Sequence, residues 1–298
     1  MCSRFRRRGS GAGGRRGRAA PVTLVVLLTV IFTGSVAAPL PRSPADRLPS
    51  GPADRLRVCA DPNNLPFSNA RGEGLENRLA ELVARETRTR VDYFWWAQRR
   101  GFFRNTLNAG HCDVVMGVPH DLPAVLTTRP YYRSSYVFVS RADKELGIDS
   151  FDHPALPRLR IGVQVVGDGA NTPPMNALAR RGLARNLVGY TVFGDYSQPN
   201  PPARIMDAVA RGQVDIAVVW GPLAGYFASR ESTPMKLVRL ARDAEERPLS
   251  FAISMGVRAG DTALRARLDR IIERRRTAVE QLLDEYGVPR DSLPLSGS

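Results

Sequence analysis

Strand-like and helix-like segments alternate along residues 56–118, and this alternation limits the folds open to the chain. Short apolar runs rich in Val, Ile and aromatic residues are typical of strands, and apolar residues three or four apart are typical of helices. Three strands and two helices are predicted here: strands 56–60, 91–96 and 114–118, and helices 75–85 and about 100–108. This order predicts a parallel sheet with right-handed crossovers.

The alternation restarts after a strand predicted at 136–139. The second unit is predicted to hold strands 160–164, 189–193 and 215–220, and helices 174–181 and 203–211. A strand at 249–255 then returns the chain to the first unit, where 262–285 predicts one long helix. We therefore expect an α/β fold with two lobes joined by two hinge-crossing strands. The first lobe comprises 55–138 and 248–290, the second comprises 139–247, and 291–298 form a tail.

The first 37 residues have the order of a secretory signal peptide. Seven arginines and no acidic residue precede an apolar run at 22–32. Small residues follow this run and end with Ala37. The run is well short of the about 20 residues that span a bilayer. We expect cleavage after Ala37, a periplasmic location and no stable membrane anchor. The export route stays open, because the arginines are crowded but form no clean twin-arginine core. Residues 38–54, rich in Pro, Ser and Gly, predict a flexible lead-in.

The charge of the chain argues against a nucleic-acid partner. Removing the seven arginines of the signal lowers the formal net charge from +14 to +7, and the remaining basic residues are spread along the chain rather than gathered in a stripe. One segment is richer in arginine, with Arg267, Arg270 and Arg274 on the helix predicted at 262–285. Acidic neighbours at helical spacing predict a solvated face. The alternative is an electrostatic docking surface for an acidic partner.

Two cysteines lie outside the signal, Cys59 and Cys112. An even pair in an oxidising compartment predicts a disulfide, and two buried free thiols are the alternative. A bridge requires neighbouring strands with Cα atoms within about 7 Å. The three histidines are far apart in the sequence, so we expect no zinc site and no cofactor.

Several segments resemble periplasmic solute-binding proteins of family 3. They are EGLENRLA (73–80), LTTRPYY (126–132) and IMDAVARGQVDIA (205–217). Three more resemble the binding-protein-like subfamily that accompanies quinoprotein methanol dehydrogenases: VCADPNNLPFSN (58–69), WWAQRRGFFRNTL (95–107) and AGHCDVVMGVP (109–119). The resemblance covers about 56–290. It implies the two-lobed type II fold and, as partners, a periplasmic dehydrogenase that uses pyrroloquinoline quinone and its cytochrome c.

The sequence departs from the amino-acid-binding members of that family. Those relatives hold the substrate carboxylate with an Arg shortly after the third strand. Here no Arg occurs between Gly117 and Arg129. They also place an Asp after the last strand of the second lobe, where this chain has Trp220. The resemblance therefore implies that the chain does not bind a zwitterionic amino acid.

Ligands of open α/β sheets bind at the carboxyl ends of the strands, which predicts a cleft lined by loops 61–67, 117–120, 167–172 and 220–225. The candidate ligand-binding residues are Asp61, Asn64, Phe67, Gly117, Tyr131, Tyr132, Gly167, Thr172, Trp220 and Tyr226. The aromatic members could stack on a flat or apolar molecule, or pack the lobe interface. Capping and the helix dipole favour Glu73 and Glu76 at a helix start, so neither residue requires a catalytic role.

Three functions follow from these patterns. The first is an accessory protein that contacts a quinoprotein dehydrogenase and aids its maturation or activity. The second is an importer component that delivers a small non-zwitterionic solute to a permease. The third, an enzyme on the same scaffold, is disfavoured because no catalytic constellation is evident. Fold alone does not decide among them.

Overall fold

The computed structural model describes residues 54–291 except 168–169, 192, 194–195 and 241–248. The expected signal peptide at 1–37, nearly all of the lead-in at 38–54 and all but the first residue of the tail lie outside the described residues. So does the expected return to the first lobe at residue 248.

Most strands join one sheet in the order β10-β8-β11-β7-β13-β5-β1-β4. Three short strands are attached beside this path, since β12 pairs with β7, β6 with β13, and β9 with β8. The path strands are β1 (Arg55–Ala60), β4 (Arg90–Trp95), β5 (Val114–Pro119), β7 (Tyr132–Arg141), β8 (Ile161–Gly167), β10 (Leu187–Thr191), β11 (Ile216–Trp220) and β13 (Ser250–Val257). The attached strands are β6 (Leu126–Thr127), β9 (Ala170–Asn171) and β12 (Met235–Arg239), and β2 (Asn63–Asn64) pairs separately with β3 (Ser68–Asn69).

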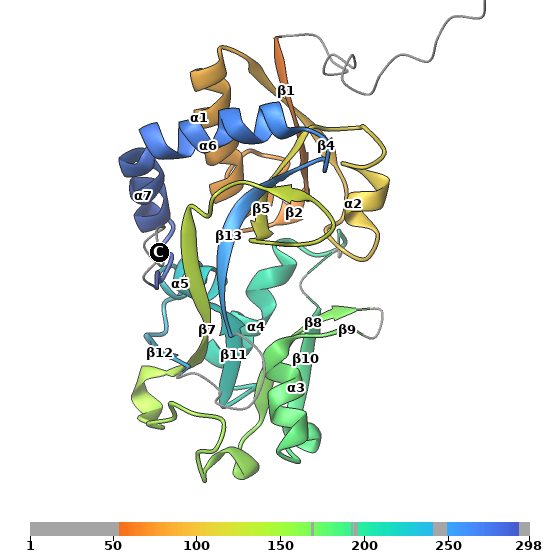
Figure 1. Ribbon diagram of the computed structural model, residues 1–298. Coiled ribbons are helices and arrows are strands. Elements are labelled where there is room, and N and C mark those ends of the chain that lie inside the picture. Colours follow the sequence, from red (N-terminus) through yellow and green to blue (C-terminus); the bar gives the residue numbers. More distant parts are fainter. Residues whose placement is uncertain (1–53, 168–169, 192, 194–195, 241–248, 292–298) are drawn as a thin grey trace, which may run out of the picture. The chain divides into compact units, whose positions relative to one another are not determined.

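Helices connect the strands, as the alternation in the sequence predicts (Figure 1). The α-helices are α1 (Leu75–Thr87), α2 (Phe102–Asn105), α3 (Pro173–Arg180), α4 (Arg204–Ala210), α5 (Gly221–Ala228), α6 (Thr262–Arg274) and α7 (Arg276–Glu285). Short 3₁₀ segments are η2 (Ala142–Lys144), η3 (Leu156–Arg158), η4 (Ala184–Asn186) and η5 (Pro201–Ala203). None of the described helices is long and apolar enough to cross a membrane.

Strands β7 and β13 link the two halves of the sheet. The first part of β7, from Tyr132 to Ser135, pairs antiparallel with β13, and the rest pairs with β11 and β12. On its other side β13 pairs with β5, which is parallel to β1 in the first half. In the second half, β8 is parallel to β10 and β11. The expected pair of crossing strands is therefore present, whereas the lobe boundary expected at 138/139 stays a prediction.

Helix α1 is amphipathic and buries one face against the first half of the sheet. Its buried apolar residues recur at helical spacing, including Leu75, Leu79 and Val83, as expected for a surface helix over a core. They pack in one cluster with Val58 and Met255, which lie on β1 and β13. This packing fixes the start of α1 near the carboxyl ends of β1 and β5.

The predicted bridge between Cys59 and Cys112 is present, so the alternative of free thiols is wrong. Their Cα atoms lie 5.5 Å apart, and both residues are buried among apolar side chains that include Phe102 and Leu107. The bridge closes a loop of 53 residues, which corresponds to about 4 kcal/mol of lost chain entropy in the unfolded state. It ties β1 to the segment that enters β5.

Three sequence predictions about helices were wrong. The single helix expected at 262–285 is two helices separated at Arg275, which donates to Glu86 on α1 at 2.7 Å. No Gly or Pro marks this break in the sequence. The helix expected at about 100–108 is only one turn, because it begins after Gly101 with φ of 84° and ends at Thr106, whose hydroxyl donates to the carbonyl of Phe102.

The third error concerns the loop expected at 220–225, which is the start of helix α5. Pro222 occupies the first turn, where its missing N–H costs nothing. Six of the eight residues of α5 are buried, so the helix lacks the polar face that periodicity would detect. The sequence reasoning also missed β12, a short strand beside β7 in which Lys236 and Arg239 flank only two apolar residues and leave no clear alternation.

Candidate functional site

A pocket of about 290 Å³ lies where the crossing strands meet the carboxyl ends of strands from both halves of the sheet. Residues on and around β1, β5, α1 and β13 form one side: Asn64, Phe67, Glu76, Gln98, Gly117, Val118, Pro119, Phe251 and Ile253. Residues of β7 and the second half of the sheet complete it: Tyr132, Tyr136, Gln164, Val166, Thr172, Phe193, Trp220 and Leu223. Among these residues Glu76 alone is charged.

The start of α1 positions Glu76 and Phe67 together. The carbonyls of Pro66 and Phe67 accept from the first helical N–H groups, those of Leu75 and Glu76, each at 2.8 Å. Gly74 is required before the helix because a Cβ there would collide with the carbonyl of Phe67. These contacts fix the loop that carries Phe67 against the helix end that carries Glu76, so both side chains border the pocket.

The Glu76 side chain is not part of the helix cap. That role belongs to Asn77, whose amide oxygen accepts from the backbone N–H groups of Gly74 and Asn69, each at 3.0 Å. Glu73 precedes the helix and accepts from Arg71 and Asn69 at 2.8 Å. The assignment of both acids to an ordinary helix start therefore accounts for Glu73 but leaves the burial of Glu76 unexplained.

The Glu76 carboxylate is buried and unpaired. The residue is 9% exposed, and within the described part of the chain its carboxylate takes part in no hydrogen bond or ion pair. It lies directly over Gly117 of β5, where a Cβ would collide with a carboxylate oxygen. Burial, and to a smaller degree the charge of Asp61, raise the pKa of Glu76 from an ordinary 4.5 to about 8.

Asp61 is also buried, but its carboxylate is satisfied. It accepts from the backbone N–H groups of Asn63 at 2.9 Å and Gln98 at 2.7 Å. Burial raises the pKa of Asp61, and the two hydrogen bonds oppose that rise. The Asn64 amide donates to the Gln98 side chain at 3.0 Å. Asp61 therefore orders this part of the rim without lining the pocket itself.

Part of the pocket lining is aromatic. Trp220 lies edge-on to Tyr136, with ring centroids 5.3 Å apart, and to Phe251, with centroids 5.9 Å apart. The backbone N–H of Trp220 donates to the Gln164 side chain at 2.8 Å, and the carbonyl of Gln164 accepts from Thr172 at 3.0 Å. These bonds hold Trp220, and with it this aromatic wall, in place at the pocket.

Six of the ten residues predicted for the cleft line this pocket: Asn64, Phe67, Gly117, Tyr132, Thr172 and Trp220. Asp61 supports the rim, and Gly167 lies at the end of β8. Tyr131 points instead into the first half, where its hydroxyl donates to the carbonyl of Met116 at 2.8 Å. Tyr226 on α5 stacks against Tyr286 and lies under the guanidinium of Arg230. Ligand binding by any of these residues stays a prediction.

Sequence reasoning missed Glu76, Gln98, Gln164, Tyr136 and Phe251 as pocket residues. Glu76 carried a usable signal, since it follows the apolar Leu75 on the predicted helix face that turns toward the sheet. Tyr136 and Phe251 lie on the crossing strands, where the sequence pattern shows a strand but not which face meets the pocket.

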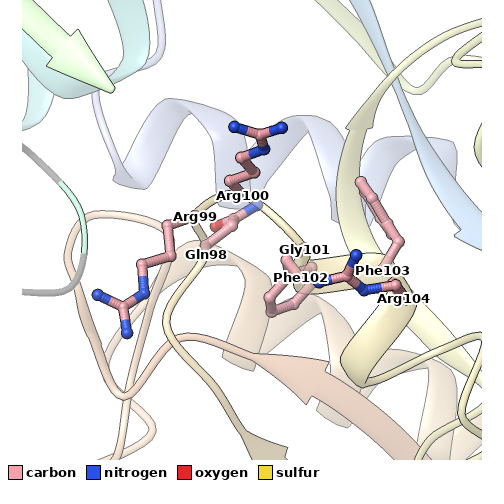
Figure 2. A pocket seen from close by; sticks show the side chains of 7 residues that line it. All are labelled: Gln98, Arg99, Arg100, Gly101, Phe102, Phe103 and Arg104. Carbon is pink, nitrogen blue, oxygen red and sulfur yellow. The ribbon is translucent and has the colours of Figure 1, made fainter. Parts of the chain in front are cut away.

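A second pocket of about 290 Å³ is lined by one continuous segment, residues 98–104. Figure 2 shows the side chains of Arg99 and Arg100 diverging from this segment instead of converging on a common point. Ligand sites bring polar groups from several elements to one place. The pocket around Glu76 meets that requirement and this one does not. No group of three or more His, Cys, Asp and Glu side chains is arranged to hold a metal ion within the described ranges.

The three predicted docking arginines are exposed on α6. Arg267 donates to the carbonyl of Thr87 at 3.3 Å, and Arg274 lies 3.6 Å from the carboxylate of Glu86. Arg270 forms no ion pair within the described part of the chain. Of the three, Arg270 is therefore the one whose charge is available to another molecule.

Comparisons with known proteins agree with this architecture. No protein-family model matches the chain. Protein MoxJ of Methylorubrum extorquens is 35% identical over 304 residues, which cover 95% of this chain and 98% of that protein. The crystal structure of the periplasmic binding protein XoxJ from Methylobacterium extorquens AM1 is 34% identical, with a TM-score of 0.66 over 80% of this chain and all of that one. The crystal structure of MxaJ from Methlophaga aminisulfidivorans MPT is 28% identical, with a TM-score of 0.70 over 79% of this chain and all of that one. The chain therefore belongs to the MoxJ family and has the two-lobed type II fold of periplasmic binding proteins.

Proposed function

We propose that this chain is a periplasmic accessory protein of a methanol or alcohol dehydrogenase that uses pyrroloquinoline quinone. In this role the binding-protein fold contacts the enzyme, and through it the enzyme's cytochrome c, or supports the enzyme's maturation or activation. The observation that carries the proposal is the match to protein MoxJ along 95% of the chain, because the resembled subfamily accompanies such dehydrogenases. A periplasmic location is supported by the likeness to XoxJ, a periplasmic binding protein.

The pocket supports a role other than amino-acid delivery. None of the described residues that line it is an Arg or Lys, so it offers no cation to a substrate carboxylate. Arg129, the first Arg after β5, faces α6 instead, where it contacts Asp269 and lies 3.3 Å from Glu273. Among its described lining residues, the pocket thus offers no partner for the carboxylate of an amino acid.

The exposed arginines of α6 are the proposed contact surface. A basic surface attracts an acidic partner at long range and speeds its encounter more than it increases final affinity. Because Arg270 has no ion-pair partner in the described structure, replacing its charge disturbs the surface without breaking an internal contact. We expect no catalytic activity from the chain itself.

The proposal is tested by deleting the gene and measuring dehydrogenase activity with methanol in periplasmic extract. We expect activity to fall and to return with the wild-type gene.

The purified chain is also expected to bind the purified dehydrogenase, in its calcium or its lanthanide form, as measured by calorimetry. Arg270→Glu should slow association by about tenfold at low salt and less at high salt.

The matched control is Arg185→Glu, which makes the same charge change at an exposed residue of η4 in the second half of the sheet. It should leave association unchanged. Unaltered dehydrogenase activity in the deletion strain, together with no association of the purified proteins, would overturn the proposal. Loss of uptake of a solute in that strain, with methanol oxidation intact, would establish the importer function instead.

A further inference from the structure

We propose that the pocket around Glu76 binds a primary organic amine that has a flat or apolar body and no carboxylate. This inference does not depend on the dehydrogenase partner, because it follows from the chemistry of the pocket alone. It concerns a small molecule and the interior of the fold, whereas the proposed partner contact concerns an exposed helix.

The unpaired carboxylate is the first observation behind the proposal. A buried ionised group without a partner is costly, and buried acids in proteins are normally paired or hydrogen-bonded. The acids nearest to Glu76 have partners, since Asp61 accepts two backbone hydrogen bonds and Glu73 is bound to Arg71. Glu76 has none in the described structure, and it borders an open pocket. An ammonium group would supply the missing charge and the missing hydrogen-bond donors.

The aromatic wall is the second observation. Phe67, Tyr132 and the group formed by Tyr136, Trp220 and Phe251 surround the space that Glu76 borders. Aromatic faces attract cations, and they also stack on flat molecules. The volume of about 290 Å³ is near the lower end of the range for small-molecule sites, so the pocket suits an amine with a body larger than a methyl group.

The described residues that line the pocket include no Arg or Lys, and this restricts the class of ligand. A ligand with a carboxylate beside its amine would bring a second charge that no described lining residue can neutralise. Its carboxylate would also lie near Glu76 and Asp61, which carry the same sign. The pocket should therefore accept an amine and reject the corresponding amino acid.

Binding of a cation should release a proton in the neutral range. The pKa of Glu76 stands at about 8 in the free protein, so most of its carboxyl groups are protonated at pH 6.5, and an ammonium ion stabilises the ionised form. The other titratable groups that face Glu76 are Asp61 and the hydroxyls of Tyr93, Tyr131 and Tyr132. Burial raises the pKa of each tyrosine above its ordinary value of 10.0, so none of them ionises in this window.

The test uses calorimetry on the purified protein with three probes that share a phenylethyl body. They are 2-phenylethylammonium, the neutral 2-phenylethanol and the zwitterionic phenylalanine. The amine should bind at least about tenfold more tightly than either of the others. Its affinity should rise about tenfold per pH unit between pH 6 and 8 and then level off, and buffers of different ionisation enthalpy should show a released proton.

Glu76→Gln should weaken amine binding by about 10- to 100-fold and abolish the pH dependence. Because glutamine resembles the protonated acid, we expect the variant to fold, and urea unfolding checks this. The matched control Glu73→Gln changes a neighbouring acid outside the pocket and should leave affinity unchanged. Equal affinity for the amine and the alcohol, unchanged binding in Glu76→Gln, or no saturable binding of the amine would each overturn the proposal. If the protein binds the amine but does not associate with the dehydrogenase, the amine proposal is upheld and the proposed function is wrong.

Discussion

An acidic residue lies beside each end of β5: Asp113 is half-buried and paired, whereas Glu76 is buried and unpaired within the described residues. Asp113, just before β5, accepts two hydrogen bonds from Arg57, at 2.8 and 2.6 Å, and another from Arg258 at 2.7 Å. Glu76, over Gly117 near the other end, has no partner in the described structure. Burial raises the pKa of Asp113, but the bonds from both arginines outweigh it and hold the pKa below 3.8. The pKa of Glu76 is raised to about 8.

This contrast separates a structural acid from a functional candidate. The Asp113 end is closed, since Arg258 also donates to the carbonyl of Cys112, which is bridged to Cys59. The Glu76 end opens into the pocket. Groups with strongly perturbed pKa values in a pocket are candidates for function, whereas an acid paired on both sides serves the fold. The predictions below test this difference from the largest expected effect to the smallest.

Replacing the unpaired acid should stabilise the fold. The folded pKa of Glu76 lies above its ordinary 4.5, so its contribution to stability is fully present below pH 4.5 and is lost as the pH rises through about 8. By pH 8 this loss is on the order of 4 kcal/mol. Glu76→Gln should therefore be more stable than the wild type by that amount at pH 8 and equal to it near pH 4.5, as measured by urea unfolding. A less stable variant at pH 8 would show that Glu76 has a stabilising partner.

Replacing the paired acid should have the opposite sign. Asp113→Asn leaves Arg57 and Arg258 without their shared carboxylate and should cost about 3 kcal/mol at pH 7. Because the folded pKa of Asp113 is lowered, its contribution is present above pH 3.8 and is lost as the pH falls through the folded pKa. The deficit should therefore shrink in acid. Asp92→Asn, which removes an exposed partner of Arg55, is the control and should change stability little. An equal loss in both variants would contradict the account.

The smallest effect concerns the contact between β5 and Glu76. Gly117→Ala places a Cβ against the Glu76 carboxylate and should cost about 2 kcal/mol by overpacking. The cost should diminish in a Glu76→Ala background, because the collision is then absent. Gly260→Ala is the control, since a Cβ there meets no atom within 4 Å. Urea unfolding of Gly117→Ala, Glu76→Ala, the double variant and the control gives the coupling free energy between the two positions. An equal cost of Gly117→Ala in both backgrounds would place Glu76 away from Gly117.

The sequence predicted the elements whose periodicity is strong. Helix α1 and strands β1, β5 and β11 occur within a few residues of the predicted ranges, because each has an apolar pattern set by one buried face. Helix α5 was missed since it is buried on nearly all sides and shows no such pattern. The break at Arg275 was missed because no Gly or Pro marks it in the sequence.

The candidate site was predictable in part for the same reason. Loops at strand ends follow from the alternation, and Phe67, Gly117 and Trp220, which were predicted at such loops, line one pocket. Tyr226 was assigned to the cleft because a loop was expected where α5 begins, and the helix directs it toward Tyr286 instead. Glu76 was overlooked because an acid at a helix start has an ordinary explanation, and only the fold shows that its carboxylate is buried beside a pocket.

The most direct test of the contrast is a carbon-13 NMR titration of the side-chain carboxyl groups, with Glu76 and Asp113 assigned by Glu76→Gln and Asp113→Asn. Our account predicts that Glu76 titrates near pH 8 in the free protein and that its pKa falls when 2-phenylethylammonium is added, while Asp113 titrates below 3.8 in both samples. If Glu76 titrates near 4.5 and its pKa does not change when the amine is added, it is an ordinary solvated acid, and the account is contradicted.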